Sequence, residues 1–318
     1  MTFRLPRLVA GLLCTALLGA CGAAQGEGRG DAGDAATLKV GAAFYPLEYL
    51  VAQVGGEHVQ VQALTKPGAE PHDVELSPRQ VGGVAQSDLV VYERGFQPAV
   101  DSAVDGEAAD HSLDVSRSAR LDLVAVEEDH GGGTREEHAD HARAGTADPH
   151  FWLDPVRYAD VGDAVAAALT ARDQAHAAAY QQNAKAFRAR MVALDEEFRA
   201  GLASCRVTDL VTSHAAFGYL AEAYGLRQES ISGLTPESEP SPGTLAAVSR
   251  HVRATGATTI YAETLVSQDV AQTLSRESGA RLAVLDPIEG ITTASKGKDY
   301  PSVMRANLAT LRAGQECA

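Results

Sequence analysis

Residues 174–203 constrain the fold most, because their pattern predicts one long helix. The larger side chains of this segment recur at steps of four, three, four, three and four residues, which is a helical period and not a strand period. At 1.5 Å per residue the helix would span roughly 45 Å, longer than a small domain is wide. The predicted buried stripe consists of Tyr180, Ala184, Phe187, Met191, Leu194 and Phe198.

Charged residues fill the other faces of this helix, so we expect one buried stripe with solvent on the remaining sides. They include Lys185, Arg188, Arg190, Asp195 and Glu196. By periodicity alone, a coiled coil or an ordinary core helix would account for the segment equally well. Its position favours a connector over these two alternatives, because strands alternating with helices lie on both sides of it. We therefore interpret it as a stiff connector between two lobes.

The alternation of strands and helices predicts an α/β protein with two parallel-sheet lobes joined by this helix. Before the connector, strands are predicted at residues 38–44, 59–64, 88–92 and 121–126, and helices at 46–54, 77–86 and 96–104. After it, strands are predicted at residues 207–212, 226–231, 258–262 and 280–285, and helices at 214–224, 242–255, 268–278 and 302–311. The predicted lobes occupy residues 37–155 and 204–318, and residues 156–203 form the helical segment between them.

The beginning of the chain predicts export. Arg4 and Arg7 precede an apolar run that ends at Ala20, which is typical of a signal peptide over residues 1–20. Leu18-Gly19-Ala20-Cys21 resembles the bacterial lipobox, in which the cysteine is lipidated and becomes the mature N-terminus. The alternative is a plain cleavage site followed by a chance cysteine. Residues 21–36 are rich in Gly, Ala and Asp, which is typical of a flexible tether. We therefore expect an extracytoplasmic protein anchored by lipid to the bacterial cell membrane.

Charge and motifs exclude two classes of function. The formal net charge of -15 leaves no basic patch for nucleic acid. The chain has no Gly-x-x-x-x-Gly-Lys-Ser/Thr motif, so it does not hydrolyse nucleotides with a P-loop.

The cysteines predict one disulfide. Cys14 lies in the leader and Cys21 is assigned to lipid, which leaves Cys205 and Cys317 in a compartment where disulfides persist. Cys205 precedes the first strand of the second lobe, and Cys317 follows its last helix. We predict that they pair, with two unpaired cysteines as the alternative. No Cys-x-x-Cys motif is present, which excludes a thiolate zinc site.

One biased segment, residues 127–147, lies within the first predicted lobe, shortly before the helical segment. It carries acidic residues on both sides of a Gly-rich turn and predicts a mobile surface loop. A solvated acidic loop without a function is one interpretation. We favour a weak auxiliary zinc site at His130, His138 and His141.

Five further polar residues follow predicted strands. They are His72, His150 and His214, after the second, fourth and fifth strands, and Asp286 and Glu289, after the last. In open parallel sheets the ligand crevice lies beyond the carboxyl ends of the strands, so loops from both lobes can converge there. Three neutral imidazoles and one carboxylate make a closed tetrahedral set suited to zinc.

The remaining candidates are assigned other roles. His58, His111, His176 and His251 lie in strand or helix patterns and are not expected to bind metal. Asp154 is expected to cap the helix that begins at Pro155. Glu70 is expected behind the ligands or as a substitute for one of them.

Several sequence segments, taken together, are highly specific for one family of proteins. PHDVELSP, DPHFWLDP, TSHAAFGYLA, ISGLTPESEPSP, LDPIEGIT and GKDYPSVMRANL occur in this order between residues 38 and 311. With the connector helix and the His/acid loop, they resemble the metal-binding solute-binding proteins of ABC transporters, of the zinc-uptake type. The resemblance implies two lobes joined by one rigid helix, with the metal between them. His72, His150 and His214 match the three histidines of that family.

The resemblance implies a monomeric receptor that captures Zn²⁺ outside the membrane and delivers it to an ABC permease with its ATPase. It leaves the fourth ligand open, because family members use a carboxylate at the position of either Asp286 or Glu289. Glu289 is favoured, since Asp286 could serve a structural hydrogen bond. His214 favours zinc, because it provides a third nitrogen donor. The resemblance implies two histidines and two carboxylates for the manganese-type relatives, which suits manganese's preference for oxygen.

Other functions remain as alternatives. A receptor for manganese or another divalent metal would have the same architecture. A secreted zinc hydrolase would need an open coordination position and a general base, and no His-Glu-x-x-His motif is present. An adhesin or a siderophore receptor is a third class. A siderophore would need a broad basic or aromatic cleft, whereas the chain has 5% aromatic residues and one Trp.

Overall fold

The structure is a computed structural model that describes residues 37–125, 146–237 and 239–318. The predicted signal peptide, the tether, Cys21 and the histidines at 130, 138 and 141 lie outside the described residues. Within the described part of the chain, no helix is both long and apolar enough to cross a membrane. The domain boundaries given above stay a prediction.

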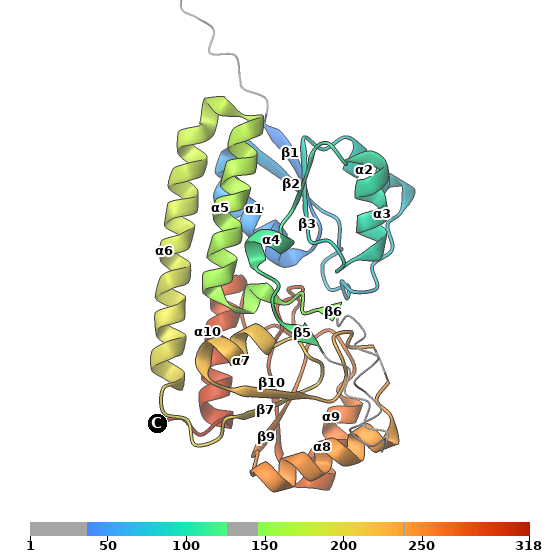
Figure 1. Cartoon of the computed structure of the whole chain (residues 1–318), viewed down its shortest axis with the longest axis vertical. Coiled ribbons are helices and arrows are strands. Elements are labelled where there is room, and N and C mark those ends of the chain that lie inside the picture. The colour runs from blue at the N-terminus through green and yellow to red at the C-terminus, as the bar shows by residue number, and fades with distance from the viewer. Residues whose placement is uncertain (1–36, 126–145, 238) are drawn as a thin grey trace, which may run out of the picture. The chain divides into compact units, whose positions relative to one another are not determined.

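The first sheet has four parallel strands, in the order β2-β1-β3-β4 (Figure 1). Its strands are β1 (Leu38–Ala42), β2 (Val59–Ala63), β3 (Leu89–Tyr92) and β4 (Ser112–Asp114). The connecting helices are α1 (Tyr45–Gly55), α2 (Pro78–Ala85), α3 (Pro98–Glu107) and the short α4 (Ser116–Ala119). All four residues of β3 are buried, which agrees with its continuous apolar sequence.

The prediction that residues 121–126 form a strand of this sheet is wrong. The edge position belongs to β4, which pairs with β3 through Val90 and Ser112. The polar sequence of β4 gives no strand signal, because an edge strand of three residues needs little apolar surface. Of this predicted strand the structure describes residues 121–125, and among these only Val124–Ala125 forms a strand, β5, which pairs antiparallel with β6 (Thr146–Ala147).

The second sheet repeats the topology of the first, in the order β10-β9-β7-β8. Its parallel strands are β7 (Asp209–Thr212), β8 (Arg227–Ser230), β9 (Thr259–Ala262) and β10 (Arg281–Val284). The helices are α7 (Gly218–Tyr224), α8 (Pro242–Thr255), α9 (Asp269–Ser278) and α10 (Tyr300–Gly314). In each sheet the second strand along the chain lies on one side of the first and the third lies on the other. The α/β prediction with two parallel sheets is confirmed.

In sequence, two long helices come between the two sheets, α5 (Pro155–Arg172) and α6 (Ala177–Leu202). In space they lie side by side (Figure 1). The carboxylate of Asp154 accepts hydrogen bonds from the amides of Val156 and Arg157, so it caps α5 as predicted. A 3-10 turn, Gln174–His176, joins the two helices.

The predicted buried stripe of α6 is confirmed, since all six of its side chains are buried. One charged residue departs from the prediction: Asp195 is also buried. It accepts hydrogen bonds from Arg199 Nε at 2.8 Å and from the Tyr224 hydroxyl at 3.2 Å, which compensate for its loss of hydration.

Helix α6 contacts both lobes, as a connector must. Near its start, Asn183 donates to the carbonyl of Val54 at the end of α1. Near its end, Glu197 accepts two hydrogen bonds from Arg305 of α10. The same continuous helix therefore supports α1, beside the first sheet, and α10, beside the second.

Cys205 and Cys317 form a disulfide, as predicted. The backbone around it is also paired, since the Val207 amide donates to the Gln315 carbonyl at 3.0 Å. The bond ties the end of the chain to the segment that enters β7.

Candidate metal centre

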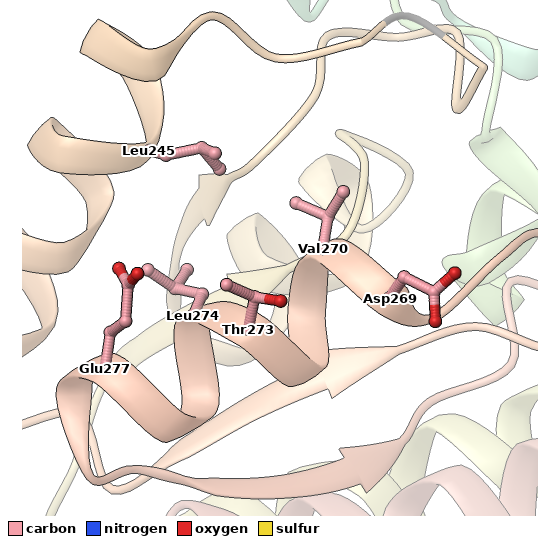
Figure 2. Close-up of a pocket in the computed structure, with 6 residues that line it drawn as sticks. All are labelled: Leu245, Asp269, Val270, Thr273, Leu274 and Glu277. Atoms are coloured by element: carbon pink, nitrogen blue, oxygen red, sulfur yellow. The ribbon is translucent and has the colours of Figure 1, made fainter.

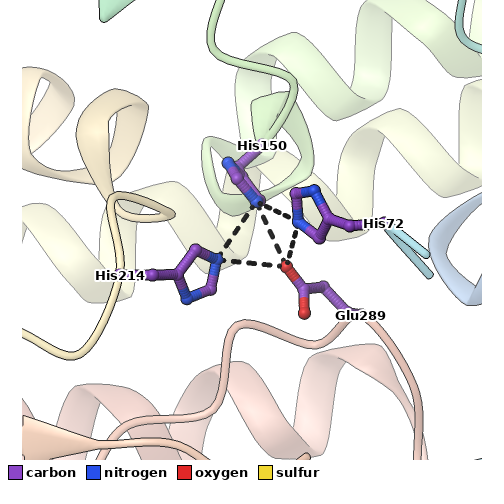
Figure 3. A group of neighbouring side chains, drawn as sticks. All are labelled: His72, His150, His214 and Glu289. Carbon is purple, nitrogen blue, oxygen red and sulfur yellow. Dashed lines mark hydrogen bonds and ion pairs between the residues drawn. The ribbon is translucent and has the colours of Figure 1, made fainter. Parts of the chain in front are cut away.

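Four loops bring three histidines and one glutamate together. His72 lies in the loop after β2, and His150 directly precedes the 3-10 turn Phe151–Leu153. His214 lies between β7 and α7, and Glu289 lies in the loop after β10. We call these four residues the His3Glu cluster (Figure 3). Two sequence expectations need correction here. His150 follows β6 and not a strand of the first sheet, and the helix after His214 begins four residues later, at Gly218.

The ligand atoms of the cluster converge on one point (Figure 3). The Nε2 atom of His150 lies 3.3 Å from His72 Nε2, 3.4 Å from His214 Nε2 and 3.1 Å from Glu289 Oε1. Glu289 Oε1 lies 3.3 Å from the Nε2 atoms of both His72 and His214. All four atoms lie within 4.8 Å of one another.

These separations fit a tetrahedron around zinc. With Zn–N bonds of about 2.0–2.1 Å, neighbouring ligand atoms in a tetrahedron are about 3.3–3.4 Å apart. Four atoms define six pairs, and the five distances given above run from 3.1 to 3.4 Å. The side chains of His150 and His214 are fully buried, and the side chain of His72 is 7% exposed.

Two carboxylates outside the cluster orient two of the histidines. Asp148 Oδ1 lies 2.8 Å from His150 Nδ1 and also accepts the His150 amide. Glu263 Oε2 lies 2.7 Å from His214 Nδ1, and its other oxygen accepts the His214 amide. With Nδ1 protonated and donating, Nε2 presents its lone pair to the centre of the cluster. Residue types and spacing did not indicate these two partners, although Asp148 stands only two residues before His150.

The buried charges shift the pKa values of the cluster. Burial lowers the pKa of His72. Burial alone would also lower the pKa of His150, but hydrogen bonds to Asp148 and Glu289 raise it above its usual value. For His214, the effect of burial is overcome by Glu263 and Glu289, which raise its pKa to about 10. Burial acts to raise the pKa of Glu289, but its three histidine partners hold it well below its usual range.

Glu70 lies behind His72 and outside the cluster. Its carboxylate accepts hydrogen bonds from the amides of His72 and Asp73, and so shapes the loop that carries His72. Its Oε1 atom lies 3.9 Å from His72 Nε2. Burial and the nearby charge of Glu289 raise the pKa of Glu70 to about 7.

The structure separates the two carboxylates that the sequence left open. Glu289 is a member of the cluster and Asp286 is not. Asp286 Oδ1 accepts the amide of Ile288 at 2.8 Å, and the Asp286 backbone pairs with the side chain of Asn307.

The other described histidines lie apart from the cluster. His111 and His251 pair with the neighbouring carboxylates of Asp110 and Asp209. The rings of His58 and His176 stack with centroids 3.9 Å apart.

One pocket lies on the second lobe, and another is lined by residues of both lobes. A pocket of about 230 Å³ between α8 and α9 is lined by Leu245, Asp269, Val270, Thr273, Leu274 and Glu277, none of which belongs to the cluster (Figure 2). A pocket of about 160 Å³ borders Glu289 and is also lined by residues such as Glu48 and Lys66. The second pocket places open space next to the carboxylate of the cluster.

The chain is similar to known zinc-binding proteins. The family described as ZnuA, zinc-uptake complex component A, periplasmic, matches residues 40–314. The chain is 35% identical over 285 residues to the zinc-binding protein AdcA of Streptococcus pyogenes serotype M6, and this match covers 86% of the chain. The chain covers 55% of that relative, or about half its length.

A second relative matches over nearly its whole length. The high-affinity zinc uptake system protein ZnuA of Bacillus subtilis is 33% identical over 308 residues, and the match covers 94% of each chain. Among solved structures, the Zn(II)-bound ZnuA-like domain of Streptococcus pneumoniae AdcA is similar, with a TM-score of 0.71 and 31% identity. That similarity covers 88% of this chain and 99% of the domain. The chain therefore belongs to the ZnuA family of zinc-uptake complex components.

Proposed function

We propose that this protein is an extracytoplasmic receptor that captures Zn²⁺ with His72, His150, His214 and Glu289 and delivers it to an ABC permease with its ATPase. The observation that carries the proposal is the spacing of the four ligand atoms, which suits a tetrahedral zinc ion. The family and the names of its zinc-binding members support it.

Zinc is favoured over manganese by the donor atoms. Three imidazole nitrogens and one carboxylate oxygen match the preferences of zinc, whereas manganese prefers oxygen donors and more of them. The carboxylates of Asp148 and Glu263 increase the basicity of two imidazoles, which strengthens binding to zinc.

Capture and delivery follow from the origin of the ligands. His72 comes from the first lobe, His214 and Glu289 from the second, and His150 from the segment that leads into α5. Separation of the lobes would divide the ligand set and lower the affinity for the metal. We propose that the signal peptide and a lipid on Cys21 place this receptor at the outer face of the membrane, as a monomer. We propose that the loop histidines at 130, 138 and 141 collect zinc weakly.

A secreted zinc hydrolase is the candidate from another class. Catalytic zinc needs a position open to water. Four protein ligands fill the tetrahedral shell, so we propose a receptor and not an enzyme.

Zinc titration of single variants tests the proposal. His72→Ala, His150→Ala, His214→Ala and Glu289→Gln should each lower the affinity for zinc by orders of magnitude, measured by competition with a chromophoric chelator. His111→Ala is the matched control, because His111 lies outside the cluster, and its affinity should equal that of the wild type. Wild-type affinity in two of the three histidine variants would show that the ligand set is wrong. Turnover of esters, peptides or phosphoesters by the zinc-loaded protein would instead support the hydrolase.

A further inference from the structure

The turn that carries Glu289 has a strained backbone. Ile288 has a φ of 60°, in the left-handed region, and is one of three described non-glycine residues with positive φ. A β-branched residue adopts this conformation rarely, because its side chain crowds the backbone. Such a conformation persists only where the surroundings hold it. Ile288 is fully buried and directly precedes Glu289.

One clamp on this turn comes from its own lobe. Asp286 Oδ1 accepts the Ile288 amide at 2.8 Å. Asp286 is itself fixed by Asn307 of α10, which accepts the Asp286 amide at 3.0 Å and donates to its carbonyl at 2.7 Å. Both side chains are buried, so water does not compete for these bonds.

The other clamp comes from the segment that carries His150. Trp152 Nε1 donates to the carbonyl of Pro287 at 2.8 Å, in a buried setting. The indole ring lies 5.3 Å from the His150 ring and 5.1 Å from Phe44 of the first lobe, measured between centroids. A single side chain therefore contacts both the ring of one ligand and the turn that presents another.

We infer that Trp152 and Asp286 are positioning residues that hold the strained Pro287–Ile288 turn and so present Glu289 to the metal. The inference rests on the proposed zinc-receptor function. The Trp152 bond joins the His150 segment to the second lobe, so a motion that separates this segment from the second lobe breaks it. The Asp286 clamp then holds the turn alone, which weakens the left-handed conformation of Ile288 and lets Glu289 move away from the site. Withdrawal of the fourth ligand is thereby coupled to opening of the lobes.

A double-mutant cycle tests this coupling. Trp152→Phe retains an aromatic ring and removes the donor to Pro287. It should raise the rate of zinc loss to a chromophoric chelator by about tenfold, the effect of one buried hydrogen bond. If Trp152 acts through Glu289, Glu289→Gln should lower the affinity much less in the Trp152→Phe background than in the wild type. Asp286→Ala should show the same non-additivity.

Tyr158→Phe is the matched control. The Tyr158 hydroxyl donates to the carbonyl of Pro46 and contributes one buried hydrogen bond that does not involve the Glu289 turn. Its effect on zinc affinity should combine additively with that of Glu289→Gln, although it lowers stability against urea. Additive effects of Trp152→Phe and Glu289→Gln would overturn the inference and leave the receptor function intact. An absence of any effect of Glu289→Gln in the wild-type background would instead overturn the ligand set, and the inference with it.

Discussion

Each histidine of the cluster is tuned by the residues that contact its ring. Asp148 and Glu263 hold His150 and His214. Among the described residues no carboxylate holds Nδ1 of His72, and its ring packs edge-on against Phe96, with centroids 4.7 Å apart. Three buried carboxylates, Asp148, Glu263 and Glu289, surround the imidazoles. The pKa values of His150 and His214 are raised, so protons on these two imidazoles offset part of the negative charge in the metal-free protein.

This exchange of protons for metal predicts proton release. The pKa of His214 is raised to about 10, so its imidazole is protonated at neutral pH, and zinc must displace the proton from Nε2. Affinity should therefore fall as the pH is lowered, and zinc binding at pH 7.5 should release protons. Calorimetry in buffers with different ionisation enthalpies measures their number.

Glu263→Gln identifies the source of the released protons. Removal of this carboxylate lowers the pKa of His214, because Glu263 is the main group that raises it. Fewer protons should then be released per zinc at the same pH. An unchanged number in this variant would contradict the role assigned to Glu263.

At the scale of elements, α6 depends on its buried stripe. The Phe187 ring packs against Tyr158 with centroids 5.2 Å apart, and Phe187 is fully buried. Phe187→Ala should lower the free energy of unfolding by about 3–5 kcal/mol, because it leaves a cavity between α5 and α6. Val192→Ala on the same helix is the control, since Val192 is 41% exposed, and it should be nearly neutral. Urea unfolding of both variants checks this, and equal losses would contradict it.

The segment between β5 and β6 can be tested by deletion. The ladder pairs Ala125 with Thr146, so the two ends of the segment lie next to each other. Deletion of residues 128–141 should leave the tight zinc site intact and remove weaker additional zinc, because His72, His150, His214 and Glu289 already supply four ligands for a tetrahedral ion. Zinc titration of the deletion variant provides the measurement. Loss of the tight site would assign loop histidines to it.

At the scale of the whole molecule, the disulfide closes the second lobe. Cys205 and Cys317 are 112 residues apart in sequence. Cys205→Ser/Cys317→Ser should lower the free energy of unfolding by about 4–5 kcal/mol if loop entropy dominates. Zinc affinity should stay unchanged, because neither cysteine belongs to the cluster. Guanidinium unfolding and chelator competition measure the two quantities. A loss of zinc affinity without a loss of stability would contradict this account.

The sequence by itself determined the features that depend on local periodicity. The stripe from Tyr180 to Phe198 repeats with the helical period, and its burial follows from that period alone. The parallel sheets follow from alternating strands and helices. Because loops that follow parallel strands lie at one edge of the sheet, the sequence also selected His72 and His214. It selected His150 as well, although His150 follows β6 and not a strand of the first sheet, and the structure brings the three together.

Only the tertiary structure decided what depends on contacts between distant residues. The edge strand β4 carries no apolar pattern, and its place follows from pairing with β3. Asp286 and Glu289 stand three residues apart in one loop, and residue type does not distinguish them. Asn307 fixes the backbone of Asp286, and the Asp286 carboxylate accepts the Ile288 amide. The left-handed Ile288, next to the Pro287 carbonyl that Trp152 holds, turns Glu289 toward the histidines. Glu263 lies 49 residues from His214, so their pairing exists only once β7 and β9 are neighbours in the sheet.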